Sequence, residues 1–204
     1  GGNSFELVDN PKTGYDFNPY VIQALKLIRD DPESLPRQAD DISPEMYQII
    51  KKDKSHPWHG YVGFACSFGG KYFGGRIKAY YKGDKEAHRT DRVTTQYTAS
   101  QITSKALQGA FLECRGFASL AGLDDCIIYC DPPYKGTTGY DKDFDQDTFW
   151  GYCRVWAKRG NKVFISEYSA PNDFVCIWEK EIPMRMNTNK SKAVEKLFIH
   201  KSQI

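Results

Sequence analysis

This sequence of 204 residues lacks the features that mark several protein classes. It contains no apolar run long enough to cross a bilayer and no signal peptide, so we expect a soluble, cytoplasmic protein without a membrane partner. Its six cysteines form no CxxC pair and its four histidines complete no zinc site, so we expect no metal. Free cysteines indicate a reducing compartment, and Cys126 and Cys130, which flank an apolar run, are predicted to be buried.

The composition fits one globular domain with a small inserted lobe, because 40% of the residues are hydrophobic and 14% are aromatic. A net charge of only +2 does not indicate a nucleic-acid partner. The charge is unevenly distributed, however: residues 51–108 hold eleven basic and four acidic residues, a local charge of +7. Such a segment suits contact with a polyanion, although a solvated lysine-rich surface gives the same pattern.

Helix signals dominate the beginning of the chain. A short extended stretch ends at Asp16, and Asn18 and Pro19 then suit the cap and first residue of a helix that runs to about Arg29. Ser43 and the proline after it predict the start of a second helix.

Residues 57–83 differ from their surroundings because they are rich in glycine and aromatic residues. We expect loops and a hairpin in this segment, without a regular helix. A further helix of roughly 15 residues is predicted after Thr90.

The C-terminal part alternates apolar runs with one amphipathic helix. This alternation predicts an α/β fold with an open, mostly parallel sheet and helices on its faces. The expected elements are a buried parallel strand at Cys126–Cys130, a helix capped by Asp145 and closed by Gly160, a strand at Lys162–Ser166, and two strands at 174–181 and 193–200 that form an antiparallel pair.

The segment that carries chemistry is Asp131-Pro132-Pro133-Tyr134, directly after the Cys126–Cys130 strand. Open α/β sheets bind ligands at the carboxyl ends of their strands, so this loop lies where a site is expected. Two prolines stiffen the loop and remove two backbone donors, which leaves its carbonyls ready to accept hydrogen bonds. A carboxylate, a carbonyl and an aromatic ring together suit a flat substrate that bears an NH₂ group.

This motif resembles that of the amino-methyltransferases, and its aspartate form is typical of enzymes specific for adenine in DNA. The run YCDPPYKGTTGY, Tyr129 to Tyr140, resembles the Dam-type (D12 class) adenine methyltransferases of phages and bacteria. The segments Gly60–Gly75, Lys162–Pro171 and Trp178–Pro183 resemble the phage branch and occur in the order expected there.

The resemblance implies a Rossmann-like methyltransferase sheet, mostly parallel with an antiparallel C-terminal strand, in which the first strand and part of the glycine loop are truncated. It implies a catalytic domain at 1–35 and 109–204. Residues 36–108 would be an inserted target-recognition region, which is the α arrangement of the motifs. A bacterial or phage-encoded monomer is expected.

The resemblance also assigns the cofactor, S-adenosyl-L-methionine, to particular residues. Gly1 and Gly2 match the end of the glycine loop, and Asp16 matches the acidic residue that bonds the ribose hydroxyls. Phe117 would pack on the cofactor adenine, with Asp131 beside the transferred methyl group. The sequence departs from the family in having Arg115-Gly116 where an acidic residue usually precedes that aromatic ring.

Catalysis is then implied for the four motif residues. The target adenine would be flipped out of duplex DNA, Tyr134 would stack on it, and Asp131 and the Pro132 carbonyl would accept its amine hydrogens, with Pro133 stiffening the loop. The remaining assigned residues would contact double-stranded DNA: Lys71, Arg76, Lys78, Tyr80, Tyr81 and Lys135. Structural packing is the expectation for Phe64 and Phe68.

Two alternatives stay open at this point. The chain could be a DNA-binding fragment whose catalysis is crippled, because the elements that usually hold the methionine end of the cofactor precede Gly1. It could also methylate adenine in RNA, where the chemistry of the base is the same. The target sequence and the biological role, whether self-protection, restriction partner or regulator, are not encoded in any motif.

Overall fold

The computed structural model describes residues 11–81, 89–133, 144–183 and 192–204 of a mixed α/β protein. The chain divides into two compact units, Gly1–Gly116 and Phe117–Ile204. The predicted insert, residues 36–108, lies within the first unit, and the predicted domain boundaries stay predictions.

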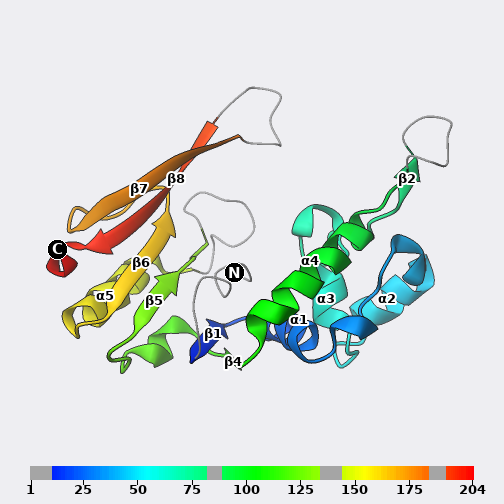
Figure 1. Cartoon of the computed structure of the whole chain (residues 1–204), viewed down its shortest axis with the longest axis horizontal. Coiled ribbons are helices and arrows are strands. Elements are labelled where there is room, and N and C mark those ends of the chain that lie inside the picture. The colour runs from blue at the N-terminus through cyan, green and yellow to red at the C-terminus, as the bar shows by residue number, and fades with distance from the viewer. Residues whose placement is uncertain (1–10, 82–88, 134–143, 184–191) are drawn as a thin grey trace. The chain divides into compact units, whose positions relative to one another are not determined.

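The first unit contains a parallel pair of strands, β1 (Lys12–Asp16) and β4 (Ala110–Cys114), with helix α1 (Pro19–Asp30) between them in the sequence (Figure 1). The side chain of Asn18 accepts a hydrogen bond from the backbone N–H of Tyr20 at 3.0 Å, which caps α1. The predicted strand, cap and helix are therefore confirmed.

Two more helices of this unit begin where the sequence predicts. Ser43 caps α2 (Pro44–Lys52) by accepting from the backbone N–H of Met46, and Asp91 caps α4 (Arg92–Leu107). Buried side chains recur along one side of α4 at spacings of seven, four and three residues, which fit the helical period. They are Val93, Ser100, Ser104 and Leu107.

The prediction that residues 57–83 contain no regular helix is wrong in part. Helix α3 (His59–Phe64) occupies their beginning, and a short hairpin of β2 (Tyr80–Tyr81) and β3 (Arg89–Thr90) follows. The glycines of this segment favoured a loop in the prediction, but Gly60 lies at a close contact between helices. A Cβ at Gly60 would lie 2.2 Å from the carbonyl oxygen of Tyr20 on α1. Glycine therefore allows α3 to approach α1 closely.

The second unit is built on a four-stranded sheet with the order β5-β6-β8-β7 (Figure 1). Strand β5 is parallel to β6, and β8 is antiparallel to both of its neighbours, β6 and β7. The predicted strands, the helix and the antiparallel C-terminal pair are confirmed. The elements are β5 (Ile127–Cys130), α5 (Gln146–Lys158), β6 (Lys162–Glu167), β7 (Phe174–Pro183) and β8 (Lys192–His200).

The prediction of a fully buried β5 is wrong. Ile127 is 69% exposed and Tyr129 is 47% exposed. Successive side chains of a strand point to opposite faces. Helix α5 packs on the other face, where Val163 and Ile165 are fully buried. Cys126 and Cys130, expected to be buried, are half-buried, whereas Cys153 of α5 is fully buried.

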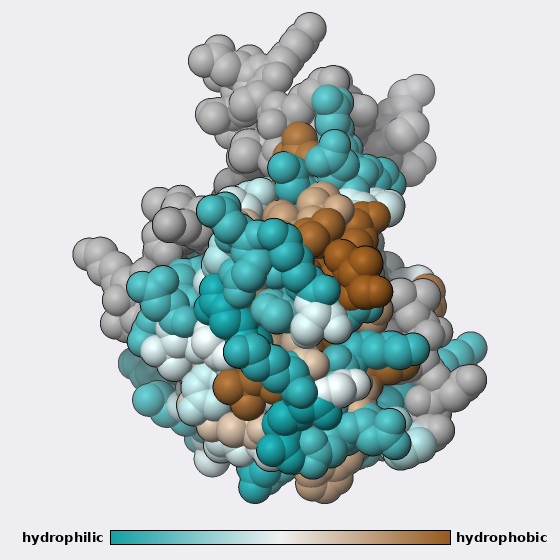
Figure 2. Space-filling model, turned by 90° about the vertical axis from the view of Figure 1, so that its left-hand side faces the viewer, coloured by the Kyte–Doolittle hydropathy of each residue, from teal (hydrophilic) through white to brown (hydrophobic). Residues whose placement is uncertain are grey.

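Polar residues dominate the face drawn in Figure 2, with hydrophobic residues gathered in a few places between them. This agrees with the mean hydropathy of −0.60. Within the described ranges, no helix is both long and apolar enough to span a membrane. The same ranges hold no group of three or more His, Cys, Asp or Glu side chains suited to a metal ion.

Candidate functional site

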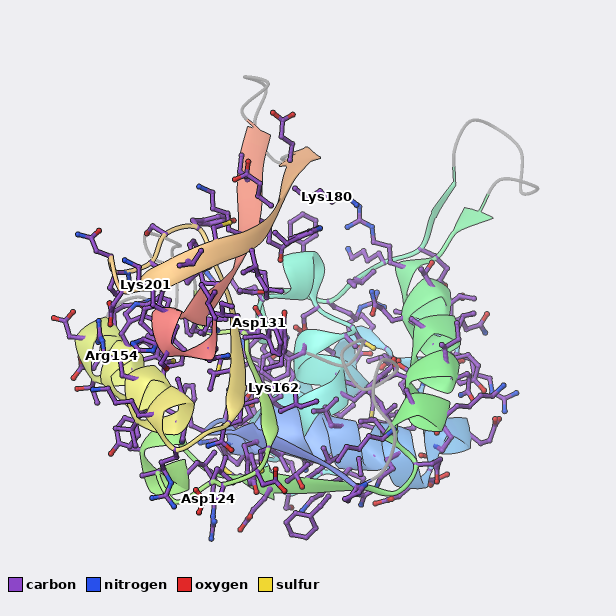
Figure 3. All side chains as sticks on the ribbon, turned by 60° about the vertical axis from the view of Figure 1, so that its left-hand side comes forward. Asp124, Asp131, Arg154, Lys162, Lys180 and Lys201 are labelled. Atoms are coloured by element: carbon purple, nitrogen blue, oxygen red, sulfur yellow. The ribbon has the colours of Figure 1, made fainter. Side chains whose placement is uncertain are left out.

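The segment Asp131-Pro132-Pro133 leaves the carboxyl end of β5, beside the carboxyl end of the parallel strand β6. Asp131 is exposed, Pro132 is buried and Pro133 is half-buried. Figure 3 shows Asp131 at the opposite end of β5 from Asp124, which precedes the strand. The motif therefore lies at the edge of the sheet where α/β proteins form their sites. Tyr134 and Lys135 lie outside the described residues.

Neither proline of the motif has a backbone N–H, so neither can donate a hydrogen bond. Their carbonyl groups can only accept, and the donors must come from other residues. The side-chain amide of Gln146, the first residue of α5, donates to the Pro133 carbonyl at 3.1 Å. Asp145 caps the same helix by accepting from the backbone N–H of Thr148 at 3.0 Å. The start of α5 thus holds the end of the motif.

A polar link also joins the two strand ends behind the motif. The Tyr129 hydroxyl and the Ser166 hydroxyl are 2.9 Å apart. Burial raises the pKa of Tyr129, and the nearby negative charge of Asp131 adds to this effect. Tyr129 therefore stays protonated in the neutral range and can act as a hydrogen-bond donor or acceptor beside the motif.

Sequence analysis missed a buried carboxylate at the end of β6. Glu167 is only 1% exposed, and its Oε2 accepts a hydrogen bond from the backbone N–H of Tyr168 at 2.6 Å. Buried acidic side chains need such partners, so the residue is fixed in place. The available signal was an acidic residue directly after the apolar run of β6.

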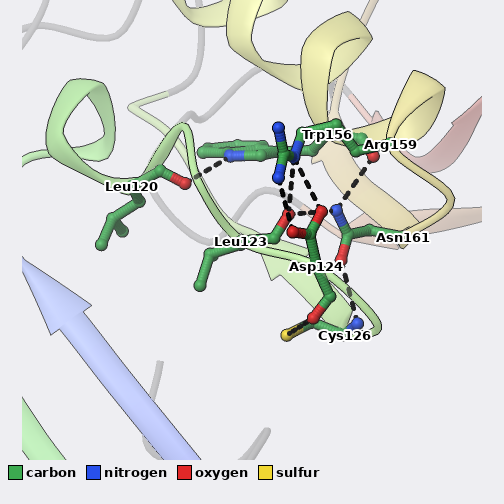
Figure 4. A network of polar contacts seen from close by, with 7 residues as sticks. All are labelled: Leu120, Leu123, Asp124, Cys126, Trp156, Arg159 and Asn161. Carbon is green, nitrogen blue, oxygen red and sulfur yellow. Dashed lines mark hydrogen bonds and ion pairs between the residues drawn. The ribbon is translucent and has the colours of Figure 1, made fainter.

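A buried network fixes the opposite, amino end of β5 (Figure 4). Asn161 is 1% exposed; its Oδ1 accepts from the Cys126 N–H at 2.9 Å, and its Nδ2 donates to the Leu123 carbonyl at 2.7 Å. The Nδ2 also donates to the carbonyl of Trp156 at 3.0 Å. These bonds tie β5 to the end of α5.

Two further contacts strengthen the same network. The indole N–H of Trp156 donates to the Leu120 carbonyl at 2.8 Å, and Arg159 forms a two-bond ion pair with Asp124. The strand that carries Asp131 is therefore anchored at its amino end by side chains of α5 and the residues around it.

The assigned cofactor residues fall in different units. Asp16 ends β1 in the first unit and is half-buried, and burial raises its pKa. Its Oδ1 accepts from the Asn18 N–H at 2.7 Å. Phe117 begins the second unit, where its ring packs against three others: Phe144, Phe149 and Tyr152. Gly1 and Gly2 lie outside the described residues.

The assigned DNA-binding residues differ in their surroundings. Lys71 and Lys78 are exposed, which suits contact with phosphates. Arg76 is half-buried, and its guanidinium donates to the carbonyls of Ala39 at 3.1 Å and Ile42 at 2.9 Å. Arg76 therefore stabilises the fold of the first unit through these two hydrogen bonds. For Tyr80 and Tyr81 only the backbone, in β2, is described.

The expectation for the aromatic residues is confirmed at Phe64 and wrong at Phe68. Phe64 packs on Tyr72 with ring centroids 4.8 Å apart, whereas Phe68 is 66% exposed. Phe68 is followed by two glycines in left-handed backbone conformations, with φ of 67° and 69°, which form a tight turn at the surface.

No model of a known protein family matches this chain, and a comparison with curated proteins finds no match either. The resemblance drawn from the DPPY segment thus has no support from these two comparisons. The grounds for a function are therefore the motif and the described residues of the structure.

Proposed function

We propose that this protein transfers a methyl group from S-adenosylmethionine to the N6 amine of adenine in duplex DNA. The observation that carries the proposal is the place of Asp131-Pro132-Pro133 at the carboxyl end of β5, next to a parallel strand. Because β8 runs antiparallel to both neighbours, β5, β6 and β7 run in one direction and β8 alone is reversed. This supports a Rossmann-like methyltransferase sheet with one antiparallel strand.

The chemistry of the motif suits an aromatic amine. The Asp131 carboxylate and the Pro132 carbonyl are acceptors that can each take one hydrogen of an NH₂ group. Holding both hydrogens in the plane of the base directs the nitrogen lone pair out of that plane, toward an incoming methyl group. The contribution of the protein is positioning and electrostatic stabilisation, without a covalent intermediate.

The cofactor would supply an electrophilic methyl group, and one residue of each unit is proposed to contact its adenosine part. Oδ2 of Asp16 has no hydrogen-bond partner among the described residues, and it suits a ribose hydroxyl. The half-exposed ring of Phe117 suits the cofactor adenine.

The substrate amine is paired and stacked inside duplex DNA, so the protein has to extrude the base before transfer. Tyr134, the next residue of the motif, is the proposed stacking partner of the extruded ring. The exposed Lys71 and Lys78 are the proposed phosphate contacts.

The test is transfer of labelled methyl groups from S-adenosylmethionine to duplex DNA by the full chain and by Asp131→Ala. We expect the variant to lose transfer and to keep its unfolding temperature, because Asp131 is exposed. Glu179→Ala serves as the control, since it removes another exposed carboxylate of the same unit. Full activity in a folded Asp131→Ala variant would overturn the proposal, and greater transfer to RNA than to DNA would change the substrate.

A further inference from the structure

The aromatic side chain of Phe68 lies at the surface of the first unit. It belongs to a short glycine-containing turn, Phe68–Lys71, which is called the tip. Phe68 is 66% exposed. Both Gly69 and Gly70 have positive φ, and apart from the adjoining residues no described atom lies within 4 Å of the position that a Cβ would take at either residue. The end of this tip is therefore open to contact from outside.

The base of the tip is fixed by buried hydrogen bonds. The Ser67 hydroxyl is 1% exposed and donates to the Val62 carbonyl at 2.9 Å, so the Tyr47 hydroxyl, also 2.9 Å away, donates to Ser67. The Tyr47 oxygen accepts from the Gly75 N–H at 3.3 Å. The Phe68 N–H donates to the Gly75 carbonyl at 2.8 Å, which joins the two ends of the loop.

The two neighbouring aromatic residues of the loop point the other way. Tyr72 stacks on Tyr20 of α1 with ring centroids 5.5 Å apart, and Phe73 is 8% exposed. The Nδ1 of His59 donates to a backbone carbonyl, so its Nε2 accepts from the Tyr72 hydroxyl at 2.5 Å. Of the three aromatic side chains in the loop, Phe68, Tyr72 and Phe73, that of Phe68 is the exposed one.

The exposed ring lies in a positively charged part of the sequence. Lys71 ends the tip and Lys78 follows it, and both side chains are exposed. An exposed aromatic ring with exposed lysines close to it in the chain fits a nucleic acid, because lysines contact phosphates and a flat ring stacks on any base. Apolar side chains on such tips can also enter between base pairs of a duplex.

We propose that Phe68 stacks on or between bases of duplex DNA while Lys71 contacts the phosphate backbone. This inference rests on the proposed function and adds to it a positioning residue for the DNA. The fixed loop base holds the backbone of Phe68 in place before binding, so little backbone conformational freedom is lost on contact. Stacking of the ring contributes to affinity, but it does not distinguish one base from another.

The experiment measures binding of fluorescent 30-base-pair duplexes of randomised sequence to the full chain across a range of salt concentrations. Phe68→Ala should weaken binding about tenfold, since loss of base stacking has effects of this order, and should leave the salt dependence unchanged. Phe68→Trp should restore affinity because it keeps a stacking ring. Ile49→Ala, which removes a similarly exposed apolar side chain from α2, is the matched control and should bind as the unmodified chain does.

Equal affinity for Phe68→Ala and the unmodified chain would overturn the inference and leave the proposed function intact, provided that methyl transfer persists. Failure of Phe68→Trp to recover affinity would overturn it too. If the unmodified chain neither binds duplex DNA nor transfers a methyl group, the proposed function and the inference both fall.

Discussion

At the residue scale, the motif depends on a side chain that lies outside it. The Pro133 carbonyl receives its described hydrogen bond from Gln146, thirteen residues further along the chain. Sequence analysis identified the loop, but it could not identify this partner. The sequence does not show which hydrogen-bond donor near the start of α5 reaches the Pro133 carbonyl.

Gln146→Leu should lower the turnover number for methyl transfer about fivefold. One lost hydrogen bond corresponds to about 1 kcal/mol, and here it would loosen the loop that carries Asp131. The KM for DNA should change little, because Gln146 contacts the motif and is not assigned a DNA contact.

Gln146→Glu separates positioning from general stability. Its carboxylate cannot donate to the Pro133 carbonyl, but a protonated carboxyl group can. Its turnover relative to that of the unmodified chain should therefore rise as the pH falls toward about 4.5. A ratio that stays flat across this range would contradict a positioning role for Gln146.

At the element scale, the placement of α3 shows where sequence patterns mislead. Gly60 and Gly63 favoured a loop, yet both belong to α3, and Gly63 faces the rings of Tyr72 and Phe73. The sequence contains no information on distance between helices, so glycine for flexibility and glycine for close packing look alike. The helices with clear caps at Asn18, Ser43 and Asp145 were predictable because a cap is a local interaction.

Gly60→Ala should destabilise the protein by about 2–4 kcal/mol, in spite of the higher helix propensity of alanine. The added Cβ would lie 2.2 Å from a backbone oxygen of α1, so the two helices would have to separate. Gly151→Ala is the matched control in α5, where nothing lies within 4 Å of the new Cβ. Urea unfolding should show the control to be neutral or more stable; equal stability of the two variants would contradict the close contact.

An ion pair between Arg154 and Asp173 joins α5 to the residue before β7, and its contribution to stability depends on pH. Arg154 of α5 bonds both oxygens of Asp173, at 2.6 and 2.9 Å, and this pairing lowers the pKa of Asp173 to about 2. The folded-state pKa is below the ordinary value of 3.8, so the ion pair stabilises the fold fully above about pH 4. That contribution is lost as the pH falls from about 4 to about 2.

Asp173→Asn should therefore remove part of the acid sensitivity. The stability difference between the unmodified chain and the variant should reach no more than about 1 kcal/mol at pH 6, since the partly exposed pair is screened by solvent. It should shrink between pH 4 and pH 2. Urea unfolding at several pH values measures it, and a difference independent of pH would exclude Asp173 as the titrating group.

At the scale of the whole molecule, the strands of the second unit, its helix α5 and the place of the motif at a strand end could be predicted from the sequence. Sequence analysis did not predict the exposure of side chains. Phe68 and Tyr129 were expected inside and lie partly outside, and Glu167 is buried. Exposure depends on which elements cover a face, and that is decided by packing between distant segments, for which a single sequence gives no pattern.

The central claim is that this chain methylates adenine in duplex DNA. The most direct measurement is mass spectrometry of the nucleosides from duplex DNA incubated with the full chain and isotopically labelled S-adenosylmethionine. We predict labelled N6-methyl-2′-deoxyadenosine from the unmodified chain and none from Asp131→Ala. A label on any other base, or no label from the unmodified chain, would contradict it.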